Sequence, residues 1–199
     1  MEASIVANGT VRSGVWLRKN LKGVIIAADG GANTCLRHRI IPDYVIGDFD
    51  SVKKRTLAAF KRSATIVHTP EQSTTDLEKA LRLAETLGAK RILVFGAIGT
   101  ELDHMMANVF ALTARSAIVD ETHDIRIIEK RFAFSGKPND IVSVIALTAV
   151  RGLTYTGLKW PVAGLSVPAG WVGIRNRLVG RKGSVSLRSG RIALIRFSA

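Results

Sequence analysis

The sequence predicts an α/β domain followed by an antiparallel β-sandwich domain, and three observations carry that prediction. Short apolar runs alternate with segments of helical period over the first part of the chain. This pattern is typical of an open, mainly parallel sheet with helices on both faces. Beyond it the runs are strand-like, and all 16 Asp and Glu lie within residues 1–140. We therefore expect an α/β domain over residues 1–135 and a β-sandwich over residues 136–199.

The elements of the first domain follow from periodicity. Apolar runs bounded by polar residues predict strands at Ser4–Ala7, Val24–Ala28, Tyr44–Gly47, Thr65–His68 and Arg91–Phe95. Apolar residues at helical spacing predict a helix over Thr74–Leu87, with Ser73 or Thr74 as its N-cap. A second helix is predicted over Leu102–Arg115, and we expect its apolar face in the core: Leu102, Met105, Met106, Val109 and Leu112.

The second domain is predicted from strand-like runs and turn residues. Four strands are expected, at Ile141–Ala149, Leu153–Leu158, Ser184–Leu187 and Ile192–Phe197. Ser189 and Gly190 separate the last two, which predicts a β-hairpin. Residues 117–135 are expected to hold two strands that bridge the domains.

Composition and charge exclude several classes of protein. With 47% hydrophobic residues the chain can bury a core, which excludes a disordered protein. Its net charge is +13, and residues 141–199 hold nine Lys and Arg without an Asp or Glu. Such a field attracts polyanions, although a solvated basic surface is the simpler interpretation. The apolar runs are far shorter than the ~20 residues of a membrane span, and a single cysteine, Cys35, fits a reducing compartment. We expect a cytoplasmic protein without a membrane partner.

Polar residues gather where the predicted strands end. Asn8 and Gly9 follow the first strand, Asp29-Gly30-Gly31 the second, and Asp48 and Asp50 the third. Asp76 starts the helix after the fourth strand, and Asp103 comes after Gly96 and Gly99. The carboxyl ends of parallel strands form one edge, so these five carboxylates are expected to converge there. Their oxygens favour Mg²⁺ or Mn²⁺ over zinc, since neither a His pair nor a Cys pair accompanies them.

Each motif also has a purely structural interpretation. Asp29 can cap a helix over Ala32–Arg39, with the glycines supplying positive φ. Asp48 can form an Asx-turn instead of sharing a cation with Asp50 across an extended segment. Asp76 can stabilise the dipole of its helix, and a lone His104 is more often structural than catalytic. The sequence lacks a P-loop, a protein-kinase loop set and a dinucleotide fingerprint after the first strand.

Taken together, the motifs resemble those of the thiamine pyrophosphokinase family. The resemblance covers most of the chain and rests on the order and spacing of six motifs. They are Ala28-Asp29-Gly30-Gly31-Ala32-Asn33, Pro42-Asp43, Ile46-Gly47-Asp48-Phe49-Asp50-Ser51, Thr75-Asp76-Leu77-Glu78-Lys79-Ala80-Leu81, Leu102-Asp103-His104 with Asn108, and Gly157-Leu158-Lys159-Trp160-Pro161 with Asn176.

The resemblance implies a homodimeric enzyme that transfers the β,γ-pyrophosphoryl group of ATP to thiamine, giving thiamine diphosphate and AMP. It implies Mg²⁺ ligands at Asp48, Asp50 and Asp76, which with Asp103 form the catalytic set. It also implies thiamine contacts from Gln72, Asp76, Asp103 and the partner chain's Asn176, at a site between the α/β domain of one subunit and the sandwich of the other. The implied nucleotide-binding residues are Asn8, Gly9, Asp29, Gly30, Gly31, Asn33, Gly96, Gly99 and His104.

This chain departs from the family pattern in places. Thr100-Glu101 stands where the family usually has Gly-Arg, so an acid replaces a cation expected to face phosphate. Arg175 stands where many members have Ser, and we hypothesise that Arg175 or Arg177 restores the missing positive charge. Trp160 or Trp171 is a candidate to stack on a substrate ring, with packing in the sandwich as the alternative. The general base is left open among Asp76, Asp103 and His104.

Two other functions remain as alternatives. The same chemistry would act on another small alcohol, such as a hydroxymethyl-pterin. A basic nucleic-acid-binding module is the alternative from a different class, but the aromatic residues of the basic segment lack the spacing of a stacking platform. We therefore do not expect nucleic acid as a partner.

Overall fold

The computed structural model describes residues 1–99 and 101–197 and divides the chain into two compact units. Unit 1 is Met1–Glu121, and unit 2 begins at Thr122. This division lies earlier in the chain than the boundary expected after residue 135. The strands β7 (His123–Ile128) and β8 (Arg131–Ser135) pair with β14 (Ile192–Phe197) and β13 (Lys182–Ser186) of unit 2, so the division falls before them.

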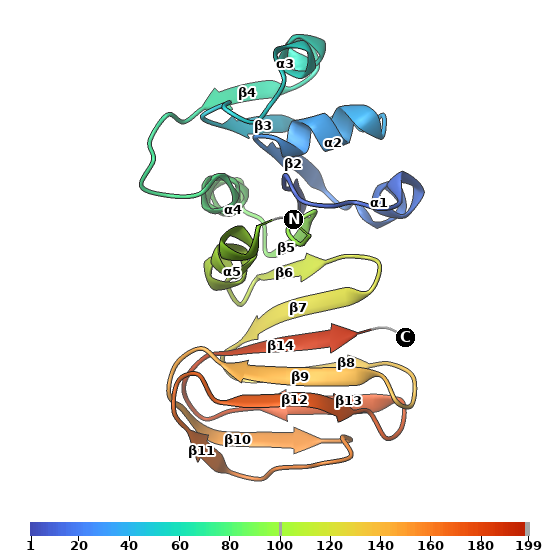
Figure 1. Cartoon of the computed structure of the whole chain (residues 1–199), viewed down its shortest axis with the longest axis vertical. Coiled ribbons are helices and arrows are strands. Elements are labelled where there is room, and N and C mark those ends of the chain that lie inside the picture. The colour runs from blue at the N-terminus through green and yellow to red at the C-terminus, as the bar shows by residue number, and fades with distance from the viewer. Residues whose placement is uncertain (100, 198–199) are drawn as a thin grey trace. The chain divides into compact units, whose positions relative to one another are not determined.

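Unit 1 is built on a parallel sheet (Figure 1). Its strands run in the order β6-β5-β1-β2-β3-β4, so the first strand of the chain lies inside the sheet. The five predicted strands are confirmed, and those at β2 to β5 have the predicted bounds. The strands are β1 (Glu2–Val6), β2 (Val24–Ala28), β3 (Tyr44–Gly47), β4 (Thr65–His68), β5 (Arg91–Phe95) and β6 (Ser116–Val119).

Helices cover both faces of this sheet, as predicted. One apolar cluster joins Val6, Ala27 and Val45 of the strands to α1 (Gly14–Asn20), α2 (Gly31–Arg37) and α3 (Lys54–Phe60). The helix α4 (Asp76–Thr86) contacts β1, β2 and β3 with buried residues that lie outside that cluster, so it covers the other face. Cys35 lies in the cluster, where burial raises the pKa of its thiol to about 12.

The helix α4 starts two residues later than predicted. Its N-cap is Thr75, not Ser73 or Thr74, and the Thr75 hydroxyl accepts a hydrogen bond from the Glu78 N–H. The Glu78 carboxylate in turn accepts from the Thr75 N–H at 2.8 Å. This reciprocal capping box fixes the first turn of the helix, and the first turn carries Asp76.

The helix α5 (Leu102–Ala111) is less buried than predicted. Within the described residues Leu102–Ala111, every side chain keeps some exposure, and Leu102, Met106 and Phe110 are 71%, 54% and 57% exposed. Only Leu112, just past its end, is buried as expected. The prediction is wrong because α5 packs beside α4 and offers its apolar stripe to solvent. None of the helices in the described part of the chain is long and apolar enough to span a membrane.

Unit 2 is the predicted β-sandwich. One sheet has the strand order β12-β9-β14-β7 and the other β11-β10-β13-β8 (Figure 1). Residues of both sheets, such as Val144 and Leu194 on one and Leu153 and Val185 on the other, share one apolar core. The remaining strands are β9 (Ile141–Ala146), β10 (Val150–Thr156), β11 (Leu165–Val167), β12 (Val172–Arg177), β13 (Lys182–Ser186) and β14 (Ile192–Phe197).

The predicted hairpin between the last two strands does not form. β13 pairs with β10 and β8, whereas β14 pairs with β7 and β9. The turn at Ser189 and Gly190 therefore carries the chain from one sheet to the other. Ser189 forms a bridge with Arg151 at this crossing, so the turn residues were recognised but their pairing was not.

Candidate active site

A pocket of about 940 Å³ opens at the carboxyl ends of the unit 1 strands. As predicted, residues after separate strands converge there. Four of the five predicted carboxylates line the pocket, namely Asp29, Asp48, Asp50 and Asp76. The other predicted residues in its wall are Asn8, Gly9, Gln72, Gly96, Gly99 and His104.

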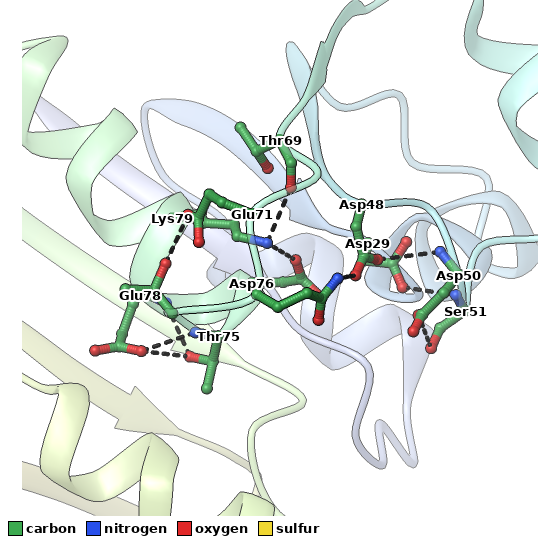
Figure 2. Close-up of polar contacts among 12 residues, drawn as sticks. Asp29, Asp48, Asp50, Ser51, Thr69, Glu71, Thr75, Asp76, Glu78 and Lys79 are labelled. Carbon is green, nitrogen blue, oxygen red and sulfur yellow. Dashed lines mark hydrogen bonds and ion pairs between the residues drawn. The ribbon is translucent and has the colours of Figure 1, made fainter.

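Asp29 organises the loop that carries Asp48 and Asp50. Its backbone has a φ of 39°, and its side chain is buried. The carboxylate accepts hydrogen bonds from the N–H groups of Ser51 at 3.0 Å and Val52 at 3.4 Å, as Figure 2 shows for Ser51. Burial raises the pKa of Asp29, and the bond from Ser51 lowers it in part. Asp29 does not cap a helix, since the N-cap of α2 is Gly30 without a side-chain bond.

Asp48 and Asp50 lie on a turn rather than on an extended segment. The Asp50 N–H donates to Asp48 Oδ1 at 3.1 Å, which closes an Asx-turn, and the intervening Phe49 has a φ of 69°. The Asx-turn and the convergence of the two acids therefore occur together. Gln72 Nε2 donates to Asp48 Oδ2 at 2.6 Å, and this bond lowers the pKa of Asp48.

Asp76 faces the pocket from the first turn of α4 beside a buried lysine. Its Oδ1 lies 3.2 Å from Lys79 Nζ (Figure 2). Burial raises the pKa of Asp76, the bond and charge of Lys79 lower it in part, and the charges of Asp48 and Asp50 raise it further. The carboxylate is thus one of several like charges gathered in a small volume.

These acids fit a hard divalent cation. Oxygen atoms of Asp29, Asp48 and Asp50 lie within 4.8 Å of one another, and the pKa of Asp76 is raised partly by Asp48 and Asp50. Carboxylate oxygens of this kind are the ligands that Mg²⁺ prefers. The three-acid group contains Asp29 in place of the expected Asp76, whose Oδ1 is bonded to Lys79.

Glycine at the floor of the pocket allows backbone segments to touch. A Cβ on Gly9 would overlap the Gly96 carbonyl oxygen and lie 2.8 Å from that of Ile98. The Gly9 N–H donates to the same Gly96 oxygen at 2.5 Å. A Cβ on Gly30 would overlap the Asn8 side chain, and one on Gly31 the Val6 carbonyl. Gly30 and Gly31 are therefore required for close approach and not for positive φ.

Some predicted site residues lie away from the pocket wall. Gly30, Gly31 and Asn33 are not among the residues that line it. The Asn33 side chain holds the neighbouring backbone instead: it accepts from the Lys53 N–H and the Thr56 hydroxyl and donates to the Ser51 carbonyl. Asp103 lies outside the lining on the exposed first turn of α5, where it accepts from the His104 N–H. Asp103 thus groups with Glu101 and His104 and does not join the four converging acids.

The departures from the family pattern fall at the rim of the pocket and in unit 2. Glu101 and His104 line the rim and approach each other to 3.9 Å, whereas Thr100 lies outside the described residues. Arg175 belongs to β12, has a φ of 58°, and donates its N–H to Ser143 Oγ.

Asn176 is buried within unit 2. Its Oδ1 accepts from the N–H groups of Trp160 and Arg177, and its Nδ2 donates to the Trp160 carbonyl at 2.8 Å. The side chain thereby holds the backbone of Trp160, a residue that is 54% exposed. Trp171, by contrast, packs against the core of the sandwich.

Sequence reasoning assigned no role to Ser51 and Lys79, which bond to the acids of the site, although both belong to the motifs quoted above, and it did not single out Glu71. Glu71 accepts hydrogen bonds from the Thr74 hydroxyl at 2.7 Å and the Ser73 hydroxyl at 3.1 Å. The one signal available for Lys79 was its place three residues after Asp76 on a predicted helix, a spacing that also occurs in surface ion pairs.

Comparisons with known proteins point to one family. Residues 17–125, more than half of the chain, match the family model described as thiamin pyrophosphokinase, catalytic domain. Thiamin pyrophosphokinase 1 of Caenorhabditis elegans is 29% identical over 115 residues, which cover 53% of this chain and 45% of that protein. Thiamine pyrophosphokinase 1 of Oryza sativa subsp. japonica is 28% identical over 192 residues, covering 78% of this chain and 70% of that protein. The aligned region thus spans about half the length of the C. elegans relative.

The fold agrees over the whole chain. The crystal structure of thiamine pyrophosphokinase from Bacillus subtilis superposes with a TM-score of 0.87 at 25% sequence identity, covering 100% of this chain and 99% of that one. The family model covers the pocket residues from Asp29 to Asn108, where the acids converge. On these grounds the chain belongs to the thiamin pyrophosphokinase family.

Proposed function

We propose that this protein transfers the β,γ-pyrophosphoryl group of ATP to the hydroxyl of thiamine, giving thiamine diphosphate and AMP. The observation that carries the proposal is the convergence of Asp29, Asp48, Asp50 and Asp76 in one pocket of a family-matched domain. Pyrophosphoryl transfer asks a protein mainly to position two substrates and to neutralise the charge of phosphate oxygens.

The metal of the proposed site is Mg²⁺, with Mn²⁺ as a substitute. Asp48 and Asp50 would hold it, joined by Asp76 or Asp29, because their oxygens form the hard donor set described above. A divalent ion bound there would neutralise phosphate charge and polarise the phosphoryl oxygens. Asp29 also bonds the Ser51 and Val52 amides, so it shapes the loop whether or not it contacts the ion.

The nucleotide is assigned to the side of the pocket formed by Asn8, Gly9, Gly96 and Gly99. All four residues line the pocket, and the glycines let the backbone segments of this wall pack closely. His104 and Glu101 form the rim on the same side. Glu101 is an acid, so the positive charge needed near the phosphates is proposed to come from Arg175 or Arg177.

Thiamine is assigned to the acidic side, since its thiazolium ring is a cation and carboxylates are favourable neighbours for it. Gln72 and Asp76 lie on that side of the pocket wall. A general base that takes the proton of the attacking hydroxyl is available at Asp76 or His104, which line the pocket, or at Asp103 on the neighbouring turn.

The test of the activity is the identity of the nucleotide product. Purified protein incubated with ATP, Mg²⁺ and thiamine is expected to release AMP in step with thiamine diphosphate. ADP in place of AMP would show simple phosphorylation and contradict the proposal. Parallel incubations with a hydroxymethyl-pterin separate the alternative acceptor, since faster AMP release with the pterin would replace thiamine as the substrate.

We further propose that the protein works as a homodimer with unit 2 binding thiamine across the interface. The exposed apolar side chains Leu102, Met106 and Phe110 of α5 and Val172 and Ile174 of β12 support an association, because water-exposed apolar patches mark interaction surfaces. Asn176 would then act through Trp160, which it holds in an exposed position.

Phe110→Glu is expected to convert the dimer to a monomer in sedimentation equilibrium, because a charge in an apolar interface is left unpaired. Val15→Glu on α1 is the matched control, since Val15 is 70% exposed on another helix of unit 1. Dimers of equal stability in both variants would place the interface away from α5.

A further inference from the structure

Lys79 is buried in the wall of the acidic pocket. Its side chain is 4% exposed, whereas that of Asp76, its ion-pair partner, is 29% exposed. The ammonium group lies 3.2 Å from Asp76 Oδ1 and 3.0 Å from the Thr69 carbonyl oxygen (Figure 2). An ammonium withdrawn from water is costly unless it is paired and hydrogen-bonded. The two contacts meet that requirement. Both residues line the pocket, and Asp76 is the more exposed of the two.

Thr69 connects this lysine to the backbone next to Asp48. Thr69 follows β4, and its N–H donates to the Gly47 carbonyl at 2.8 Å, directly before Asp48. Three residues later, Gln72 donates to Asp48 Oδ2 at 2.6 Å. The Lys79 ammonium therefore ties α4 to the segment that delivers Gln72 to Asp48.

The first turn of α4 is held by bonds that do not involve the lysine side chain. The capping box of Thr75 and Glu78 holds the first turn, and the Lys79 N–H donates to the Thr75 carbonyl at 3.0 Å within the helix. What the lysine side chain adds is a fixed orientation of the Asp76 carboxylate and an anchor for residues 69–72.

We propose that Lys79 is a positioning residue, whose ammonium aims the Asp76 carboxylate into the pocket and anchors the segment 69–72 that carries Gln72. It supplies the positive charge that Asp76 needs among Asp29, Asp48 and Asp50, and it does so from a buried position in the pocket wall. Lys79 is not proposed to touch the substrates.

The first test is amide hydrogen exchange in the protein without added metal or nucleotide. Lys79→Met keeps an unbranched side chain that is one atom shorter and removes the charge and the donors. Exchange over residues 69–75 is expected to quicken at least about tenfold, because the anchor of the segment is lost. Lys61→Met removes one exposed positive charge from the same unit and is expected to leave that segment unchanged. Unchanged exchange in Lys79→Met, or an equal rise throughout unit 1, would overturn the proposal.

The second test is kinetic and rests on the proposed function. Lys79→Met is expected to lower kcat roughly tenfold to a hundredfold, with the KM for ATP held within about twofold, because a misplaced carboxylate harms the reaction more than nucleotide binding. In an Asp76→Asn background the same change should cost little more. Independent, additive losses would contradict a role through Asp76.

The outcome of the exchange test does not depend on the proposed function, whereas that of the kinetic test does. If the protein lacks pyrophosphokinase activity, the exchange experiment still decides the positioning role. If Lys79→Met does not fold, Lys79→Gln is used, which retains a donor on a shorter and uncharged side chain. Its exchange over residues 69–75 is expected to quicken relative to wild type, and protection equal to wild type would refute the anchor.

Discussion

Asp48→Asn and Asp50→Asn are each expected to lower kcat about a thousandfold and to leave the fold intact. Both acids line the pocket, and their oxygens lie within 4.8 Å of each other and of Asp29. Loss of one charged ligand removes several kcal/mol of charge stabilisation, and each 1.4 kcal/mol is tenfold in rate. Steady-state kinetics with ATP and thiamine measure the effect. Glu85→Gln, which removes an exposed acid from α4, is the matched control.

The unfolding temperature, measured with and without metal, tests the same cation site without relying on turnover. Because a cation that binds the native state stabilises it, Mg²⁺ or Mn²⁺ is expected to raise the unfolding temperature of the wild-type protein. The increase should be lost in Asp48→Asn and kept in Glu85→Gln. Turnover and metal-dependent stabilisation that both survive in Asp48→Asn and Asp50→Asn would rule out a cation site at these residues.

Gly9→Ala is expected to damage stability and activity together. The new methyl group would overlap the Gly96 carbonyl oxygen and lie 2.8 Å from that of Ile98, and both obstacles are backbone atoms that cannot rotate away. Overpacking of this kind costs about 1–3 kcal/mol, which corresponds to a fall of roughly 3–10 °C in the unfolding temperature of a chain this long.

The displaced strand ends also form the floor of the pocket, so the KM for ATP is expected to rise in Gly9→Ala. Gly180→Ala is the control, because a Cβ at Gly180 meets open space. A wild-type unfolding temperature for Gly9→Ala would show that the two segments are farther apart than the structure places them.

The strands β1 to β5 were predictable because each is a short apolar run bounded by polar residues, and all but the edge strand β4 are mainly buried. The runs at Val24–Ala28 and Arg91–Phe95 have the expected bounds. The helices α1 and α3 were missed because they span seven residues each, too few to show a helical period. The partner of β14 was beyond prediction, since a turn such as Ser189-Gly190 does not reveal whether the chain stays in one sheet.

Site residues that directly follow strands could be predicted. Those whose role depends on hydrogen bonds between distant segments could not. Asp48 and Asp50 were found by position, although a turn with positive φ at Phe49 brings them together rather than strand alternation. Asp103 sits one residue before His104, yet it lies outside the pocket wall. Asn33 and Asn176 matched motifs, but their amides bond to backbone or to neighbouring side chains. Spacing alone does not distinguish such a supporting amide from a ligand-binding one.

The position of β14 has a consequence for biosynthesis. This strand lies between β7 and β9, although it follows every other strand of unit 2 in the chain. When residues 123–186 have left the ribosome, their sheet still lacks its central strand. One edge of β7 and one edge of β9 stay unpaired until Ile192–Phe197 is synthesised. Unit 1 has no such delay, so the nascent chain would complete its first unit while the second still needs protection from aggregation.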